Sequence, residues 1–170
     1  MKKLIILLVL FSGFNASAQN LEKIKMNMLK LAPMVGNWQG SGWIQQQDRR
    51  IEFDQKEVIN MKLDGTTLLI EGSGFENDSL MFQAMAVASF NEVTGKYRFN
   101  SFLADGKTTE AEGWFDEEGI FHWQFEVPNG GTVKYTIEFN DTTWTEKGEF
   151  SLPNVEQWFP FMAMNLKKIK

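Results

Sequence analysis

The residues best placed to do chemistry are polar side chains on strand faces that are otherwise apolar. In the segment 51–63, Gln55 and Glu57 alternate in phase with isoleucine, phenylalanine, methionine and leucine, so they share the face expected to point inward. Glu146 shares a face with Trp144 in the same way. Burying a carboxylate is costly unless it is paired or neutralised. The pattern therefore predicts a few polar groups that orient a ligand in a mostly apolar cavity.

Two tyrosines and a tryptophan complete this set. Tyr97 and Tyr135 accompany inward apolar residues, so each would bring a hydroxyl group into the interior. The predicted ligand pocket comprises seven residues: Trp38, Gln55, Glu57, Tyr97, Tyr135, Trp144 and Glu146. Two alternatives stay open. A β-bulge would shift the register and turn these groups to solvent, or the buried polar groups would satisfy one another.

The sequence predicts no catalytic, metal or cofactor residues. His122 is the only histidine, and it alternates with Phe121, Trp123 and Phe125. If the aromatic face points inward, His122 points outward. There is no cysteine and no Gly-x-Ser-x-Gly elbow. No histidine pair has the spacing of a zinc site. A carboxylate pair for glycoside chemistry stays possible, but nothing selects one.

The elements that must position these residues are strands separated by evenly spaced turns. The predicted turns are Gln47-Asp48, Asp64-Gly65, Asn77-Asp78, Thr94-Gly95, Asp105-Gly106, Glu118-Gly119, Asn129-Gly130, Asn140-Asp141 and Pro153-Asn154. They delimit ten strands, the last two at 142–151 and 156–167, and no helical segment separates any two strands. We therefore predict an all-β fold, a ten-stranded antiparallel up-and-down barrel that removes both sheet edges. A two-sheet sandwich is the main rival.

Three segments are expected along the chain. Residues 1–18 have a positive start, an apolar core and Ala16-x-Ala18, which is typical of a bacterial secretory signal peptide cleaved near Gln19. Residues 19–35 hold one short amphipathic helix, at 21–31, and residues 36–170 hold the barrel. The absence of cysteine excludes a lipid-modified cysteine anchor and disulfides. We expect a soluble, monomeric, exported protein, periplasmic or extracellular.

The charge balance restricts the partners. Removing Lys2 and Lys3 with the signal leaves 15 basic and 22 acidic residues, a net charge of −7. The sequence has no basic stripe that could offset phosphate charge, so neither a nucleic acid nor an anionic membrane is expected as a partner. The expected partner is a small apolar or amphipathic molecule.

The run Gly36-x-Trp38-x-Gly40-x-Gly42, after a short helix, resembles the opening of lipocalins and other calycins. It is closer to the nitrobindin-like barrels, and closer still to uncharacterised exported calycin-like proteins of bacteria. The segment 90–99, with Tyr97 directly after a turn, is similar too. The resemblance implies a barrel that receives a small, largely apolar molecule, with Trp38 at its closed end. Nitrobindin-like proteins ligate haem through a histidine near the C-terminus, and no histidine follows His122, so haem is not carried over.

Three classes of function remain. The leading one is a non-enzymatic protein that binds an apolar or amphipathic molecule. The second is a barrel enzyme of isomerase, cyclase or hydrolase type, which strongly perturbed carboxylates at Glu57 or Glu146 beside an open cavity would favour. The third is an acidic interaction module in which the 13 Phe, 6 Trp and 8 Met residues that follow the signal segment fill the barrel.

Overall fold

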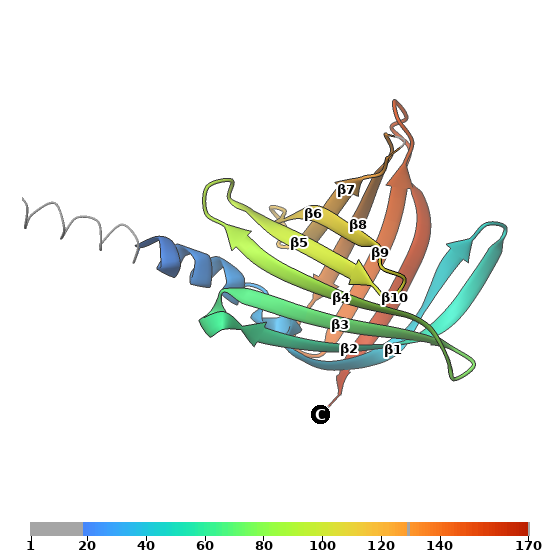
Figure 1. Ribbon diagram of the computed structural model, residues 1–170, viewed down its shortest axis with the longest axis horizontal. Coiled ribbons are helices and arrows are strands. Elements are labelled where there is room, and N and C mark those ends of the chain that lie inside the picture. The colour runs from blue at the N-terminus through green and yellow to red at the C-terminus, as the bar shows by residue number, and fades with distance from the viewer. Residues whose placement is uncertain (1–18, 129, 170) are drawn as a thin grey trace, which may run out of the picture.

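The protein forms a closed barrel of ten antiparallel strands, seen here in a computed structural model that describes residues 19–128 and 130–169 (Figure 1). The strands are β1 (Gly36–Gln46), β2 (Arg49–Lys62), β3 (Thr67–Glu76), β4 (Ser79–Asn91), β5 (Lys96–Leu103), β6 (Thr108–Phe115), β7 (Phe121–Glu126), β8 (Thr132–Phe139), β9 (Thr143–Ser151) and β10 (Phe159–Ile169). A helix covers residues 19–29, and the 3-10 helices η1 (Ala32–Met34) and η2 (Leu63–Gly65) precede β1 and β3. The prediction of a ten-stranded all-β barrel is confirmed.

The barrel closes because the first and last strands pair. β1 and β10 run antiparallel from Asn37 opposite Ile169 to Ile44 opposite Met162. Every other pair of neighbouring strands follows the order of the chain. All connections are therefore short hairpins, and the sandwich alternative is wrong. The predicted signal segment, 1–18, lies outside the described residues, as does Asn129.

Turn residues with positive φ make these tight hairpins possible. Asn77 and Asp78, which join β3 to β4, both have positive φ, at 51° and 63°. A two-residue turn of that kind matches the twist of the flanking strands. Gly95, between β4 and β5, has a φ of 71°, a conformation that costs glycine little. The predicted turns that lie wholly within the described residues fall between consecutive strands and are confirmed.

The N-terminal segment closes one end of the barrel. Met28, Leu31 and Met34 are almost completely buried against the barrel core. The indole of Trp38 donates a 2.7 Å hydrogen bond to the carbonyl oxygen of Met34. The hydroxyl of Tyr97 donates a 2.8 Å bond to the carbonyl oxygen of Asn27. These contacts place Trp38 at the closed end and tie the N-terminal segment to β1 and β5.

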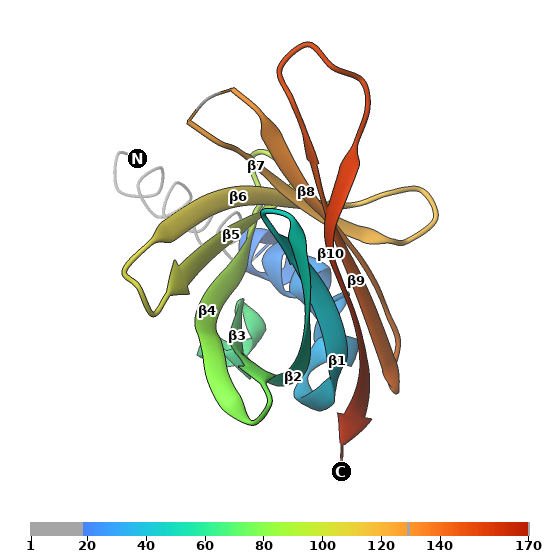
Figure 2. The same cartoon turned by 90° about the vertical axis from the view of Figure 1, so that its right-hand side faces the viewer.

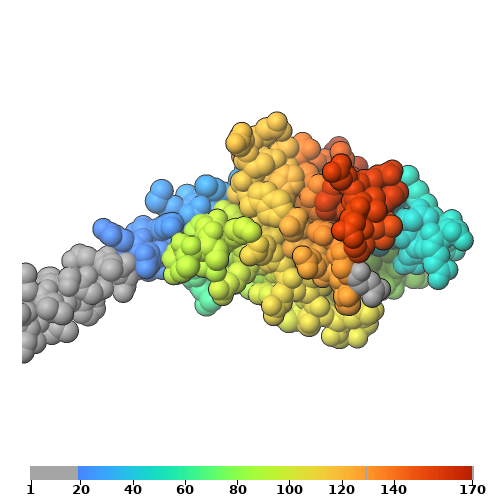
Figure 3. Space-filling model, turned by 90° about the horizontal axis from the view of Figure 1, so that it is seen from above, coloured from blue at the N-terminus to red at the C-terminus, as the bar shows by residue number. Residues whose placement is uncertain are grey.

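The opposite end carries the hairpins β1–β2, β3–β4, β5–β6, β7–β8 and β9–β10. Figure 2 views the molecule from that side, with the N-terminal helix behind the ring of strands. Figure 3 shows the β1–β2 and β9–β10 hairpins at the end away from the helix. In the part of the chain that the structure describes, no helix combines the length and apolarity needed to cross a bilayer.

Two local predictions need correction. The inward face of β2 does not extend to Leu63, which is 75% exposed with a φ of 48°, because β2 ends at Lys62 and η2 turns the chain. The last strand begins at Phe159 rather than at residue 156, after a turn in which the amide of Val155 donates to the carbonyl of Leu152.

Candidate functional site

Gln55 and Glu57 lie inside the barrel because β2 alternates strictly between its two faces. The inward residues from Ile51 to Ile59 are buried, whereas Glu52, Asp54 and Lys56 between them are exposed. No register shift interrupts the pairing of β2 with β1 or β3. The bulge that would have turned these two polar side chains to solvent is therefore absent from β2.

Gln55 and Glu57 form a buried pair that is only half satisfied. The side-chain amide of Gln55 donates a 2.6 Å hydrogen bond to Oε1 of Glu57. Gln55 Oε1 and Glu57 Oε2 are buried without a hydrogen-bond partner among the described residues. Burial raises the pKa of Glu57 to about 7, although the Gln55 hydrogen bond acts in the opposite direction. The carboxyl group is thus poised to lose a proton near neutral pH.

Glu146 is the second buried carboxyl group, on β9. Burial and, to a lesser degree, the nearby charge of Glu57 raise the pKa of Glu146 to about 8. The indole groups of Trp144 and Trp123 lower it. Neither indole N–H has a hydrogen-bond partner of good geometry within the described chain, so we take their effect to be the attraction of two nearby dipoles. At neutral pH Glu146 is mostly protonated.

Two inward glycines make room for this polar group. Gly72 on β3 lies opposite Glu57, and a Cβ atom there would stand 2.6 Å from Oε1 of Glu57. Gly148 on β9 lies opposite Tyr135, where a Cβ atom would stand 3.0 Å from the tyrosine ring and 2.8 Å from that of Phe161. Glycine within a strand often marks such a close approach. Neither role was predicted from the sequence.

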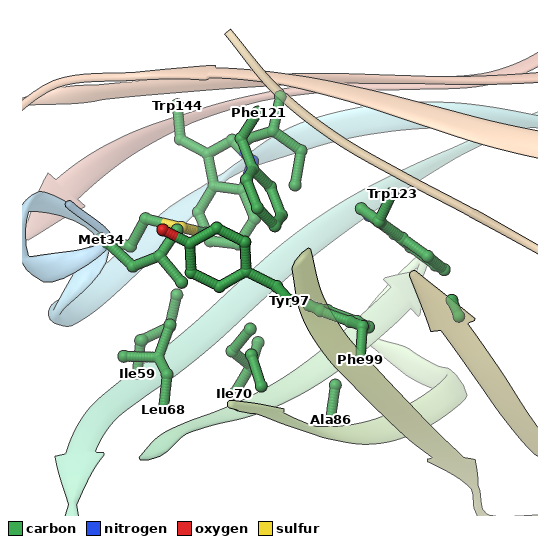
Figure 4. Close-up of a cluster of buried hydrophobic side chains, with 14 of the residues drawn as sticks. Met34, Ile59, Leu68, Ile70, Ala86, Tyr97, Phe99, Phe121, Trp123 and Trp144 are labelled. Atoms are coloured by element: carbon green, nitrogen blue, oxygen red, sulfur yellow. The ribbon is translucent and has the colours of Figure 1, made fainter. Parts of the chain in front are cut away.

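Stacked aromatic rings form one wall of the interior. Trp123 lies parallel to Tyr135 with ring centroids 4.0 Å apart, and its centroid is 4.7 Å from that of Phe99. Figure 4 shows Trp123 and Phe99 together, with Tyr97 and Trp144 nearer to Met34. Burial raises the pKa of the Tyr135 hydroxyl, and the charge of Glu146 adds to this effect. Tyr135 therefore stays protonated and can act as a donor.

A cavity of about 440 Å³ remains inside the barrel. Its wall is mostly apolar and includes the buried polar residues Gln55, Glu57 and Glu146. Met34, at the closed end, also lines the cavity. Gln46 and Met81 line it close to the hairpins of the open end. The interior is therefore not filled, which contradicts the filled-barrel alternative. Its size falls within the range of small-molecule sites.

The seven predicted pocket residues divide into two groups. Gln55, Glu57, Tyr135, Trp144 and Glu146 line the cavity. Trp38 and Tyr97 instead belong to the closed end, where both bond to the N-terminal segment. Trp38 meets Trp144 edge to face at 5.9 Å, so it supports the cavity from below. The aromatic residues Trp123, Phe125 and Phe161 also line the cavity, although they were not among the predicted pocket residues. The alternation of Trp123 and Phe125 on β7 indicated that these two point inward.

His122 lies on the outer face, as the inward burial of Phe121 and Trp123 requires. It is nevertheless largely covered, with a side chain 15% exposed. Its Nε2 is 2.8 Å from Oδ2 of Asp116 and its Nδ1 is 3.1 Å from Oγ1 of Thr136. The hydrogen bond from His122 lowers the pKa of Asp116. Within the described residues, no cluster of three or more His, Cys, Asp or Glu is arranged to hold a metal ion.

Comparison with known proteins supports the fold alone. The sequence matches no protein-family model and no curated protein. The structure is similar to the crystal structure of Rv2717c from M. tuberculosis, with a TM-score of 0.66 and 11% sequence identity. The match covers 84% of this chain and 97% of that one. At this identity the similarity extends to the barrel architecture and not to the chemistry inside it.

Proposed function

We propose that this protein binds a small amphipathic molecule inside its barrel and that the binding itself is its function. One observation carries the proposal: a cavity of about 440 Å³ with a mostly apolar wall and a compact group of buried, incompletely bonded polar atoms. An apolar wall supplies affinity by burial, and a few polar groups fix orientation. Buried polar atoms without partners are costly, so a ligand that bonds to them gains affinity.

The cavity exists because small residues occupy inward positions that large ones could fill. Ala86 on β4, Gly72 on β3 and Ser101 on β5 all line it. Meanwhile the bulky rings of Phe99, Trp123 and Tyr135 stack on one another along the wall. Stacking concentrates their volume there and leaves space elsewhere.

A titration with a neutral apolar fluorophore, N-phenyl-1-naphthylamine, tests this proposal. We expect saturable binding by the wild-type protein and loss of binding in Ala86→Phe, which fills the cavity. Met85→Phe is the matched control, because Met85 is the outward neighbour of Ala86 and is 39% exposed. Thr109→Phe, from another part of the cavity wall, gives a second blocked variant if Ala86→Phe unfolds. Equal binding by the wild type and the folded blocked variants would contradict the proposal.

A second candidate function is acid–base catalysis on the bound molecule. It is favoured by two carboxyl groups beside the cavity whose pKa values, about 7 and about 8, lie close to neutral pH. We would compare the small molecules that co-purify with wild type and with Glu57→Gln from the native host. A catalyst would retain a different species in the variant, because the substrate accumulates. A binding protein would carry the same molecule in both.

We further propose that the protein is exported and belongs with the calycin-like barrels. The support is the signal-type segment 1–18, together with the Gly36-x-Trp38 opening of the first strand of a closed ten-stranded barrel. N-terminal sequencing of the protein from the native host should begin at or within two or three residues of Gln19. Recovery with Lys2 and Lys3 still attached would contradict export.

A further inference from the structure

We propose, building on the proposed function, that the ligand carries a cationic head group, an amine or ammonium, held between Glu57 and Glu146. Its apolar part would extend along the cavity toward the open end. The two glutamates stand on β2 and β9, and both line the same cavity.

The composition of the cavity wall decides the sign of the charge. Its titratable groups are Glu57 on β2, Glu146 on β9 and Tyr135 on β8, and no Lys, Arg or His is found among the described residues that line it. An anionic ligand such as a fatty acid would meet two acidic groups there and no group of opposite charge. Burying an unpaired charge is strongly unfavourable. An ammonium group would instead be paired.

The unpaired atoms also match a cationic donor. Gln55 Oε1 and Glu57 Oε2 are both acceptors, both are buried, and both lack a partner in the described part of the chain. Gln55 is 2% exposed and Glu57 is 7% exposed. An ammonium group has several N–H donors and no acceptor, so one such group could serve both oxygens.

The indole groups complete the arrangement from the other side. Among the described residues, the N–H groups of Trp123 and Trp144 have no acceptor. Both indoles favour the ionised form of Glu146. If a cation binds and Glu146 ionises, its carboxylate becomes a better acceptor for these N–H groups. The ligand and the tryptophans would then stabilise the same charged state.

The depth of the acidic pair predicts the direction of the ligand. Glu57 lies two residues beyond Gln55 toward the closed end, and Trp144, next to Glu146 on the inward face, contacts Trp38 beneath. The wall nearer the open end includes Ile44, Met81 and Phe125. A polar head at the bottom and an apolar tail toward the mouth therefore fit the wall.

Three probes with one tail test the inference: decylamine, decanol and decanoate, each used to displace N-phenyl-1-naphthylamine at pH 7.5. We expect decylamine to bind at least about 30-fold more tightly than decanol, as a buried charge pair worth about 2 kcal/mol requires, and decanoate to bind worst. Glu146→Gln should reduce the amine-to-alcohol ratio about tenfold or more. Glu138→Gln, at an exposed position on neighbouring β8, should leave the ratio unchanged.

Proton release gives a readout that a merely structural role would not move. Both carboxyl groups are mostly protonated at pH 6.5 in the free protein, so binding a cation there should release about one proton, measured by calorimetry in buffers of different ionisation enthalpy. At pH 9.5 the release should vanish. Equal affinity for decanol and decylamine, or tightest binding of decanoate, would overturn the inference and leave the proposed function standing. Failure of every probe to bind would overturn both.

Discussion

Replacing Glu146 by glutamine should stabilise the protein at alkaline pH and have little effect at acidic pH. Glu146 is 6% exposed, and the pKa of its carboxyl group is raised from 4.5 to about 8. Between these values the unfolded chain ionises Glu146 while the folded protein keeps it protonated. The free energy of unfolding therefore falls as pH rises from about 4.5 and levels off above about 8. Glutamine has nearly the same shape and cannot ionise.

The size of the effect follows from the pKa difference. At about 1.36 kcal/mol for each pH unit, a rise from 4.5 to about 8 corresponds to on the order of 5 kcal/mol. We expect Glu146→Gln to gain several kcal/mol at pH 9 and less than about 1 kcal/mol at pH 5, where the wild-type group is neutral too. Glu57→Gln should behave likewise, with a smaller gain, because its pKa rises only to about 7.

Urea unfolding followed by tryptophan fluorescence at pH 5, 7 and 9 measures this directly. Glu138→Gln is the control, because Glu138 is exposed and its neighbour Ile137 pairs with Glu146. Its stability should follow that of the wild type at every pH. A Glu146→Gln protein that is no more stable than the wild type at pH 9 would refute the claim that this carboxyl group is buried without a counter-charge.

Three further predictions use the same unfolding assay. Tyr97→Phe removes the donor to the carbonyl of Asn27 and should cost about 0.5 to 1.5 kcal/mol; unchanged stability would show that this bond does not hold the helix. Gly72→Ala places a Cβ atom 2.6 Å from the carboxyl oxygen of Glu57 and should cost about 1 to 3 kcal/mol, with weaker binding of decylamine; a neutral outcome for both would mean that the carboxyl group moves freely. Lys168→Met removes the ammonium group that donates to the carbonyl of Pro33 and covers the ring of Trp38. It should lower the free energy of unfolding by about 1 to 2 kcal/mol. A decrease no larger than that caused by replacing an exposed lysine would contradict this prediction.

The architecture was predictable because its signals are local. Pairs such as Asp105-Gly106 mark turns by their own backbone preferences, and strict alternation in β2 places Gln55 and Glu57 on the inner face. Once ten strands follow one another through short turns, closure is the simplest way to remove two edges.

Depth within the barrel was not predictable in the same way. Alternation shows that Trp38 and Tyr97 point inward, but their height depends on strand tilt and on the helix that packs beneath them, which are long-range features. The cavity itself depends on how rings from distant strands stack, as Trp123 does on Tyr135. Gly72 and Gly148 could be interpreted only once their cross-strand neighbours were known.

Native mass spectrometry of the protein purified from its own host tests the central claim most directly. We expect one small molecule bound per wild-type chain and none bound to Ala86→Phe, in which the cavity is filled. The outward control Met85→Phe should retain the molecule. A wild-type chain that carries nothing under conditions that preserve noncovalent complexes, or a blocked variant that carries the same molecule, would contradict the claim that the cavity is a binding site.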